Sequence, residues 1–355
     1  MFLSPPSSPA YCRELTGLRA LAVSIVLVQH WLQPFFPFGE LGPSLFFVLS
    51  GYLVTGIIWR SGAYPGAPGA WGRRLGIFYL RRVLRIVPLY YLTLLGCALL
   101  PLATVREHPV WFLLPTANLL IYKSHGWGDG IGHLWTIAVE LQFYLLWPWL
   151  LAGLGRRLMP LLLVVAAGWA FRGVWAALVR PDMVHLLLPS NLDLFALGAV
   201  LCQAQGRAWL SRVAQGRYVL LAWLCWAALR LWTGPGGWTS SQVLAQSIGL
   251  ALADGLTIGW LLHNPGAGRR LGLVHPVVQW VGQRSYSLYL YHLPLLVFWQ
   301  RLVYHFSESA EQRRFFMQPL MLLLLLVPVL ALLSALSWRW VESPLARFKN
   351  RFSIE

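Results

Sequence analysis

Residues 15–33 have the sequence LTGLRALAVSIVLVQHWLQ, an apolar stretch that carries only two ionisable side chains, Arg19 and His30. An α-helix needs about 20 mostly apolar residues to cross a bilayer, so this stretch is long enough to span one. Arg19 and His30 are eleven positions apart, which corresponds to about three helical turns plus ~20° and to ~16 Å of rise. The sequence therefore predicts a transmembrane helix with both side chains on one face, at different depths.

This pair has two interpretations. A guanidinium suits a phosphate group and an imidazole exchanges protons near neutral pH, so the pair could serve chemistry inside the membrane. Ionisable groups within spans cost on the order of 3 kcal/mol, which favours a function. Alternatively, the arginine reaches the lipid headgroups and the histidine is an unrelated, hydrogen-bonded interior residue. The residues alone leave both interpretations open.

Apolar segments of this kind recur along the 355 residues. The chain is 57% hydrophobic and 11% charged, whereas soluble domains carry about 25% charged residues. Residues 110–122 are too short to span and contain Pro115, which predicts a re-entrant or interfacial piece. We therefore expect an all-α integral membrane protein with about ten transmembrane helices, at 15–33, 41–59, 84–103, 134–152, 158–178, 188–205, 217–233, 242–262, 281–304 and 315–337.

The positive charge is distributed unevenly between the connecting segments. Net charge is +16, and with the N-terminus inside, twenty basic residues fall on the cytoplasmic side and seven on the outer side. This is the positive-inside pattern, so we expect both termini to be cytoplasmic, with tails at 1–14 and 338–355 and a transmembrane domain at 15–337. The basic residues follow topology and no DNA- or RNA-binding motif accompanies them, which argues against a nucleic-acid partner. Four scattered cysteines predict neither a disulfide framework nor a metal site.

Two acids lie inside predicted spans. Glu140 is ~9 Å and Asp193 ~8 Å from the outer end of its span at helical rise, so both could share a layer with His30. A carboxylate that orients an imidazole makes it a better general base. Alternatively, each acid pairs with a buried donor such as Gln142, Tyr144 or Arg172.

Arginine residues also cluster where the third span begins, in FYLRRVLRIVPLYY at 78–91. Arg81 and Arg85 are four residues apart and share a helix face, with Arg82 beside them. Three guanidiniums could clamp a di- or triphosphate through paired hydrogen bonds. The alternative is a topological anchor that contacts lipid phosphate.

Two further polar groups interrupt predicted spans. In GQRSYSLYLYHLP at 282–294, Ser285, Tyr289 and His292 recur at helical spacing, so this stripe either lines a tunnel for a long polar ligand or binds neighbouring helices. Ser50 and Gly51 interrupt the apolar run LFFVLSGYLV, and small residues there favour close helix contact.

Seven motifs, in order along nearly the whole chain, resemble those of the bacterial acyltransferase family 3, integral membrane O-acyltransferases acting largely on cell-surface and secreted carbohydrates. The motifs are RELTGLRALAVSIVLVQH, PSLFFVLSGYLV, FYLRRVLRIVPLYY, HLWTIAVELQFYLLWP, NLDLFALGAVL, GQRSYSLYLYHLPLL and WRWVESPLARF.

The resemblance implies a multi-pass enzyme of the bacterial inner (plasma) membrane. It would move an acyl group, most often acetyl, from cytoplasmic acyl-CoA to a hydroxyl of a periplasmic or cell-surface carbohydrate or lipid-linked glycan, without a metal. His30 would be catalytic, by general base or acyl-imidazole chemistry, with Glu140 supporting it or the acceptor. The donor would be held by Arg19, Arg81, Arg82 and Arg85, and the other substrate-binding residues would be Asp193, Tyr144, His292 and Ser50.

The chain departs from the family pattern in three places. Thr16 stands where the family often has Asp before Gly-Leu-Arg, and Leu141 stands where a second acid often follows Glu140. We also expect no fused SGNH hydrolase-like domain, so that any second transfer step would need a separate periplasmic partner. The rival functions are a proton-coupled transporter or flippase of an anionic or lipid-linked sugar substrate, and a scaffold subunit of an envelope complex.

Overall fold

The protein is helical throughout the part of the chain that the structure, a computed structural model, describes. These residues are 12–32, 38–100, 102–179, 182–234, 239–264, 266–349 and 351–352, so most of the predicted N-terminal tail lies outside them. Within them lie ten long helices: α1 (Arg13–Trp31), α2 (Leu41–Ser61), α3 (Trp71–Leu99), α7 (Leu134–Leu154), α8 (Leu158–Leu178), α9 (Leu188–Ala204), α11 (Gly216–Thr233), α12 (Ser240–His263), α15 (Ser285–Phe306) and α17 (Pro319–Ser337). Each overlaps one predicted segment, which confirms the all-helical prediction.

Shorter helices connect the long ones. They are α4 (Ala103–Glu107), α5 (Pro109–Leu113), α6 (Ala117–Ser124), η1 (Val184–Leu186), α10 (Ala208–Val213), α13 (Ala267–Arg270), α14 (Pro276–Gln283), α16 (Ala310–Phe316), η2 (Trp338–Glu342) and α18 (Ser343–Lys349). The short helices α4 to α6 occupy 103–124, where the sequence predicted a piece too short to span. At the other end of the chain, α17 continues through the π-helical turn η2 into α18 without a break.

Six helices in the described residues are long and apolar enough to cross a membrane: α2, α3, α7, α8, α12 and the continuous helix Pro319–Lys349. The other four long helices do not reach this threshold. Helix α1 carries Arg13, Glu14 and Arg19 within its 19 residues, and α9 is only 17 residues long. Six of the ten long helices thus have the length and apolar composition of a membrane span, and the other four are too polar or too short.

Helix α3 begins earlier than predicted. The predicted span starts at 84, but the helix starts at Trp71. Leu75 and Phe78 are buried at helical spacing while Arg73 is exposed, so this stretch is an amphipathic helix that the hydropathy of a span does not detect. Arg81, Arg82 and Arg85 therefore lie inside the helix rather than at its entrance.

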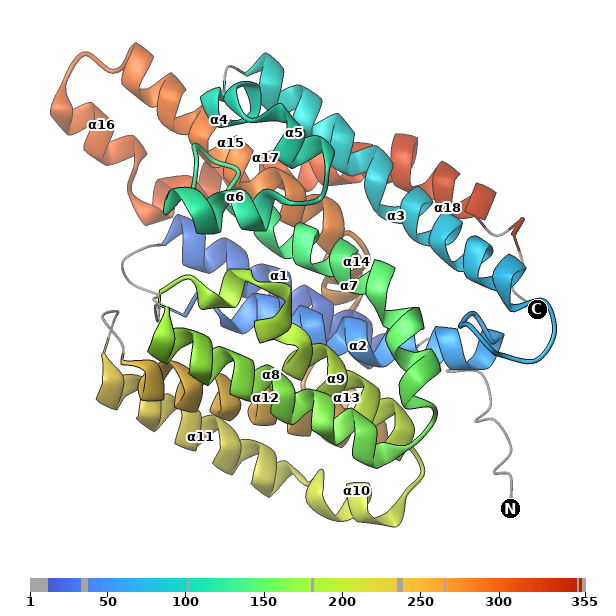
Figure 1. The fold of residues 1–355 in the computed structure, drawn as a ribbon. Coiled ribbons are helices and arrows are strands. Elements are labelled where there is room, and N and C mark those ends of the chain that lie inside the picture. Colours follow the sequence, from blue (N-terminus) through green and yellow to red (C-terminus); the bar gives the residue numbers. More distant parts are fainter. Residues whose placement is uncertain are drawn as a thin grey trace.

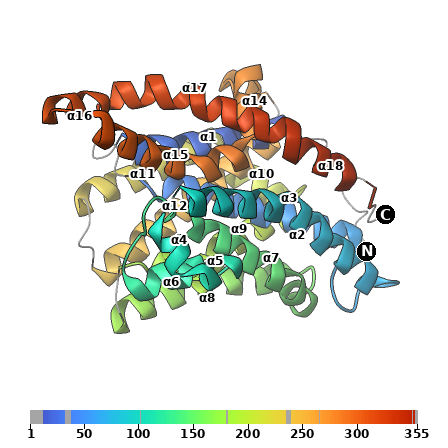
Figure 2. The same ribbon diagram turned by 90° about the horizontal axis from the view of Figure 1, so that it is seen from above.

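The long helices run side by side, with α1 between α2 on one side and α15 on the other (Figures 1 and 2). The end of α2, the start of α3 and α18 lie at one end of this bundle, on the right in Figure 1, and α4, α16 and the start of α12 lie at the other. Helix α9 packs closely on α2, because a Cβ atom on Gly51 would collide with the carbonyl of Phe195. This confirms the close contact expected at Gly51.

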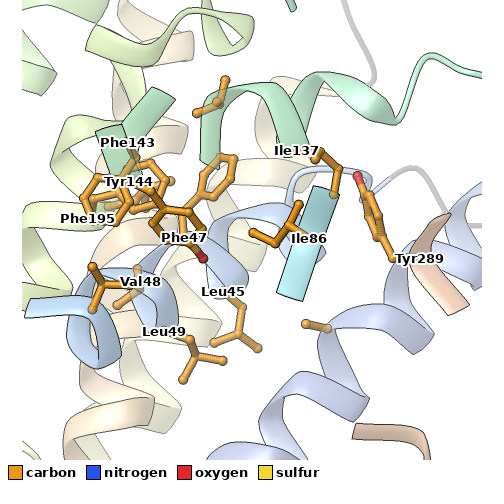
Figure 3. Close-up of a cluster of buried hydrophobic side chains, with 14 of the residues drawn as sticks. Leu45, Phe47, Val48, Leu49, Ile86, Ile137, Phe143, Tyr144, Phe195 and Tyr289 are labelled. Atoms are coloured by element: carbon orange, nitrogen blue, oxygen red, sulfur yellow. The ribbon is translucent and has the colours of Figure 1, made fainter. Parts of the chain in front are cut away.

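Aromatic side chains fill the core between α2, α7 and α9. The rings of Phe143 and Phe195 are stacked 3.8 Å apart, and the ring of Phe47 lies 4.8 Å from that of Phe195. Figure 3 shows this group on one side, with Ile86, Ile137 and Tyr289 across from it. The core thus fixes the walls of the cavities described next.

Candidate active site

A cavity of about 860 Å³ lies at the end of the bundle formed by the end of α2, the start of α3 and α18. Among the described residues, its lining includes seven basic side chains and no acid; the basic ones are Arg60, Arg74, Arg81, Arg82, Arg85, Arg156 and Lys349. We call it the inner cavity. A cluster of this kind offers charge-assisted hydrogen bonds to the oxygens of phosphate groups.

Aromatic faces and backbone oxygens hold these arginines. The Arg82 guanidinium lies over the rings of Phe78 and Tyr144, at 5.4 and 5.2 Å from their centroids. Arg81 donates a hydrogen bond of 3.3 Å to the carbonyl oxygen of Phe352. No carboxylate of the described chain lies within 4.0 Å of Arg81, Arg82 or Arg85. Their positive charge is therefore available to an anionic ligand.

A central cavity of about 250 Å³ adjoins the inner cavity, because Ile57, Arg82 and Arg85 line both. Six residues predicted for the site line it: Arg19, Ser50, Arg82, Arg85, Glu140 and Tyr144. Arg19 also donates a hydrogen bond of 3.0 Å to the hydroxyl of Ser285 on α15. The central cavity thus brings together most of the residues that the sequence predicted to bind the acyl donor, along with the predicted acid Glu140.

Glu140 is held by two hydroxyl groups. Its carboxylate accepts a hydrogen bond of 2.6 Å from Ser50 and another from Tyr144. No hydrogen bond joins Glu140 to His30 among the described residues. Of the two interpretations that the sequence allowed, pairing with a buried donor is therefore the one observed for Glu140.

The same holds for Asp193. Its side chain is fully buried and accepts a hydrogen bond of 3.2 Å from Arg172. Arg172 itself lines a third cavity, of about 540 Å³, at the opposite end of the bundle from the inner cavity. Asp193 thus lies apart from the central cavity, and its partner Arg172 is the residue that lines the third one.

His30 has a defined tautomer. Its Nδ1 lies 2.9 Å from the carbonyl oxygen of Val26, and a carbonyl only accepts, so Nδ1 carries the hydrogen and Nε2 the lone pair. The ring lies edge-on to that of His292, with centroids 5.0 Å apart. Arg19 and His30 therefore both face α15, one through Ser285 and the other through His292.

A third imidazole, His133, completes this cluster and was not predicted. Its ring centroid lies 4.8 Å from that of His292, and its Nε2 donates to the carbonyl oxygen of Leu290 at 3.1 Å. The remaining nitrogens, His133 Nδ1 and His292 Nε2, are buried without a hydrogen-bond partner in the described structure. His133 lies seven residues before Glu140, a spacing that keeps both on one helix face and was the available signal.

Tyr289 joins the histidine cluster to the central cavity. Its hydroxyl donates to the carbonyl oxygen of His133 at 2.9 Å and accepts from the Thr136 hydroxyl at 2.6 Å. Its ring lies 5.5 Å from the rings of His133 and His292, and the residue lines the cavity near Ile137 (Figure 3). His133 and His292 therefore stand directly behind one cavity wall, and His30 lies beside His292.

Comparison with known proteins gives one family and several relatives. A family profile described as an acyltransferase domain matches residues 13–338. The chain is 25% identical to the peptidoglycan O-acetyltransferase OatA of Listeria monocytogenes, over 97% of this chain and 57% of that protein. It is 23% identical to the O-acetyltransferase OatA of Staphylococcus aureus, over 96% of this chain and 58% of that protein. The chain thus spans less than two thirds of these relatives, and no solved structure matches it.

Proposed function

The chain belongs to the acyltransferase family 3, and from this membership and the cavities we propose that it is a membrane O-acetyltransferase. It would move an acetyl group from cytoplasmic acetyl-CoA to a hydroxyl of cell-wall carbohydrate outside a bacterial plasma membrane. Relatives named as peptidoglycan O-acetyltransferases support this acceptor class. Other acyl-CoA donors remain alternatives of the same chemistry.

We propose that all ten long helices cross the membrane, with both termini in the cytoplasm and the transmembrane domain at 15–337. The cavity lined by seven basic residues supports this orientation, because positively charged segments stay on the cytoplasmic side. Helix α2 runs from the third cavity to the inner one over 21 residues, about 31 Å at helical rise, which matches the thickness of a hydrocarbon core.

The inner cavity would hold the phosphate-bearing end of coenzyme A. Arg81, Arg82 and Arg85 supply paired donors for its phosphates. The pantetheine arm would pass Arg82 and Arg85 into the central cavity and place the thioester beside the wall formed by Tyr289. Arg19, on that path, would contact the arm or its phosphates.

His30 would act through Nε2, the nitrogen that carries the lone pair. In the general-base mechanism, Nε2 takes the proton of the acceptor hydroxyl while the oxygen attacks the thioester carbonyl. The carbon–sulfur bond then breaks, and the CoA thiolate takes the proton back from the imidazolium. In the covalent variant, Nε2 attacks the carbonyl first, the carbon–sulfur bond breaks and CoA leaves as the thiolate, which gives an acyl-imidazole. The acceptor oxygen then attacks the acyl carbon, the bond to Nε2 breaks, and the proton of the hydroxyl passes to the CoA thiolate. Both variants return His30 to its starting state.

The other residues would support this step. The Nε2 of His292 is buried without a hydrogen-bond partner in the described structure, and its ring lies 5.0 Å from that of His30. His292 would therefore share the proton that His30 takes up, rather than contact the substrate. Glu140, held by Ser50 and Tyr144, would accept a hydrogen bond from the substrate in the central cavity. The observation that best supports the proposal is that Arg82 and Arg85 line both the inner and the central cavity. On another side of the central cavity, Tyr289 packs against His133 and His292.

The test measures, in proteoliposomes, how many molecules of CoA are released for each molecule of acceptor acetylated. Purified protein is supplied with labelled acetyl-CoA on one side and a GlcNAc–MurNAc disaccharide on the other. We expect one CoA released for each disaccharide acetylated. Uptake of the disaccharide without CoA release would establish a transporter instead. If neither uptake nor CoA release is observed, the scaffold function is the one that remains.

A further inference from the structure

The third cavity, which we call the outer cavity, lies at the end of the bundle away from the arginine cluster. It has a volume of about 540 Å³ and is enclosed by the first turns of α2, α7, α9 and α12, together with α8, α11 and the turn η1. Cavities of roughly 300–1,000 Å³ are typical of small-molecule sites. Its place in the fold separates it from the donor path.

Aromatic side chains form a large part of its lining. Trp135 and Trp226 come from different helices, and His185 lies edge-on to Trp135 with ring centroids 5.4 Å apart. Flat aromatic faces in a largely apolar pocket accept the C–H face of a sugar ring, while polar groups around them orient its hydroxyls.

The charges of the outer cavity are balanced, unlike those of the inner cavity. Arg172 and Arg230 are accompanied by Glu40 and Asp182. The described lining of the inner cavity has seven basic residues and no acid. A polyphosphate therefore finds its complement at the inner end, whereas the outer cavity suits a hydroxyl-rich ring that does not carry several negative charges.

Two buried polar atoms in the outer lining have no hydrogen-bond partner in the described structure. They are Oε1 of Gln246 and Nε of Arg172, and both side chains are about 5% exposed. Gln246 is held by its Nε2, which donates to Thr233 at 2.8 Å, and Arg172 is held by Asp193. Leaving such atoms unpaired costs ~1–3 kcal/mol each, so a ligand that both donates and accepts would satisfy them.

The outer and central cavities share one wall. Pro43 and Phe47 line both, and Phe47 packs 5.9 Å from Trp135. A sugar ring held in the outer cavity would thus be separated from the central cavity only by Pro43 and the ring of Phe47.

We propose that the outer cavity binds one pyranose unit of the acceptor glycan. Trp135 and Trp226 stack on the ring, Gln246 accepts a hydrogen bond from a hydroxyl, and Arg172 donates one. The inference rests on the proposed transferase function, and it assigns acceptor residues that lie apart from the central cavity.

Four forms of the full chain in nanodiscs test this inference: wild type, Trp226→Leu, Gln246→Met and Trp232→Leu. Trp232 is the matched control, because it lies on the same helix as Trp226 but is 75% exposed. Equilibrium binding of labelled GlcNAc–MurNAc disaccharide and initial transfer rates are measured on each. We expect Trp226→Leu and Gln246→Met to weaken disaccharide binding about fivefold to tenfold, with the KM for acetyl-CoA unchanged.

The outcomes separate the two proposals. Unchanged disaccharide binding in both variants, or no binding by wild type, overturns the sugar site while transfer by wild type leaves the transferase standing. Altered acyl-chain preference with unchanged disaccharide binding shows that the cavity holds the donor's acyl group, and also overturns it. Binding that depends on Trp226 without any transfer supports the site and removes the transferase.

Discussion

The imidazole of His30 on α1 lies edge-on to that of His292 on α15, with ring centroids 5.0 Å apart. His292 in turn meets His133 at the start of α7, at 4.8 Å. Backbone carbonyls accept from one nitrogen of each ring, so the second nitrogen of each carries a lone pair. Three elements distant in sequence thus bring three imidazoles together, and two of them, His133 and His292, pack against Tyr289 in the wall of the central cavity.

Replacing His30 by alanine should reduce transfer from acetyl-CoA by about 10²- to 10⁴-fold, the usual contribution of a general base. Acetyl-CoA binding should be unaffected, because the arginines proposed to bind its phosphates line the inner cavity, which His30 does not. His263→Ala is the matched control, since its Nδ1 also bonds a carbonyl four residues earlier, at 2.9 Å from Gly259. Transfer within a few-fold of wild type in a folded His30→Ala protein would remove His30 from the chemistry.

Arg82→Gln should raise the KM for acetyl-CoA about tenfold or more, because charge-assisted hydrogen bonds to phosphate are lost. Kinetics with acetyl-pantetheine, which lacks the phosphates, should not distinguish the variant from wild type. Arg73→Gln serves as control, because Arg73 is exposed on the same helix. An equal defect with both donors would show that Arg82 maintains the structure rather than the donor site.

Gly51→Ala should destabilise the protein by ~1–3 kcal/mol, the usual cost of overpacking. The new methyl group would collide with the Phe195 carbonyl where α2 crosses α9. Gly153→Ala, with no atom within 4 Å of the added carbon, should be neutral or stabilising, because alanine favours helix. The midpoints of thermal unfolding in detergent compare the two, and equal midpoints would contradict the close crossing.

His185 should make stability depend on pH. Burial, and next the charge of Arg172, lower the pKa of His185 from 6.5 to about 4. Between these values the unfolded chain binds a proton that the folded chain does not, so stability should fall as pH drops from about 6.5 to 4. His185→Phe should flatten this slope, while His108→Phe, at an exposed connector between α4 and α5, should not. An unchanged slope in His185→Phe would contradict the lowered pKa.

Hydropathy located the ten long helices but not all of their limits. Apolar windows find segments that must leave water, and each predicted window contains a helix. Hydropathy did not detect the amphipathic start of α3. Arg73, Arg74 and Arg81 lower the mean hydropathy of this stretch, whereas Leu75 and Phe78 are buried on one face. Helix α1 was predicted as a span at 15–33, but its polar residues make it less apolar than the six helices that could cross a membrane.

The chemistry-bearing residues were only partly predictable. Helical spacing placed Arg19 and His30 on one face, and both contact α15. Helical spacing did not identify the hydrogen-bond partners on other helices. The carboxylate of Glu140 accepts from Ser50 as well as from Tyr144 on its own helix, and that of Asp193 accepts from Arg172. Depth in a span indicates which groups share a layer, but it does not indicate which of them face each other.

The sequence by itself determined that the chain is an all-helical membrane protein, which positions carry ionisable groups in apolar surroundings, and which of these share a helix face. These properties are periodic and local, because they follow from hydropathy and the helical repeat. Only the tertiary structure decided that His133 and His292 join His30, that Arg82 and Arg85 line both the inner and the central cavity, and that Trp135 and Trp226 line a third. Those neighbours depend on how each helix is rotated about its axis, and packing between distant helices sets that rotation.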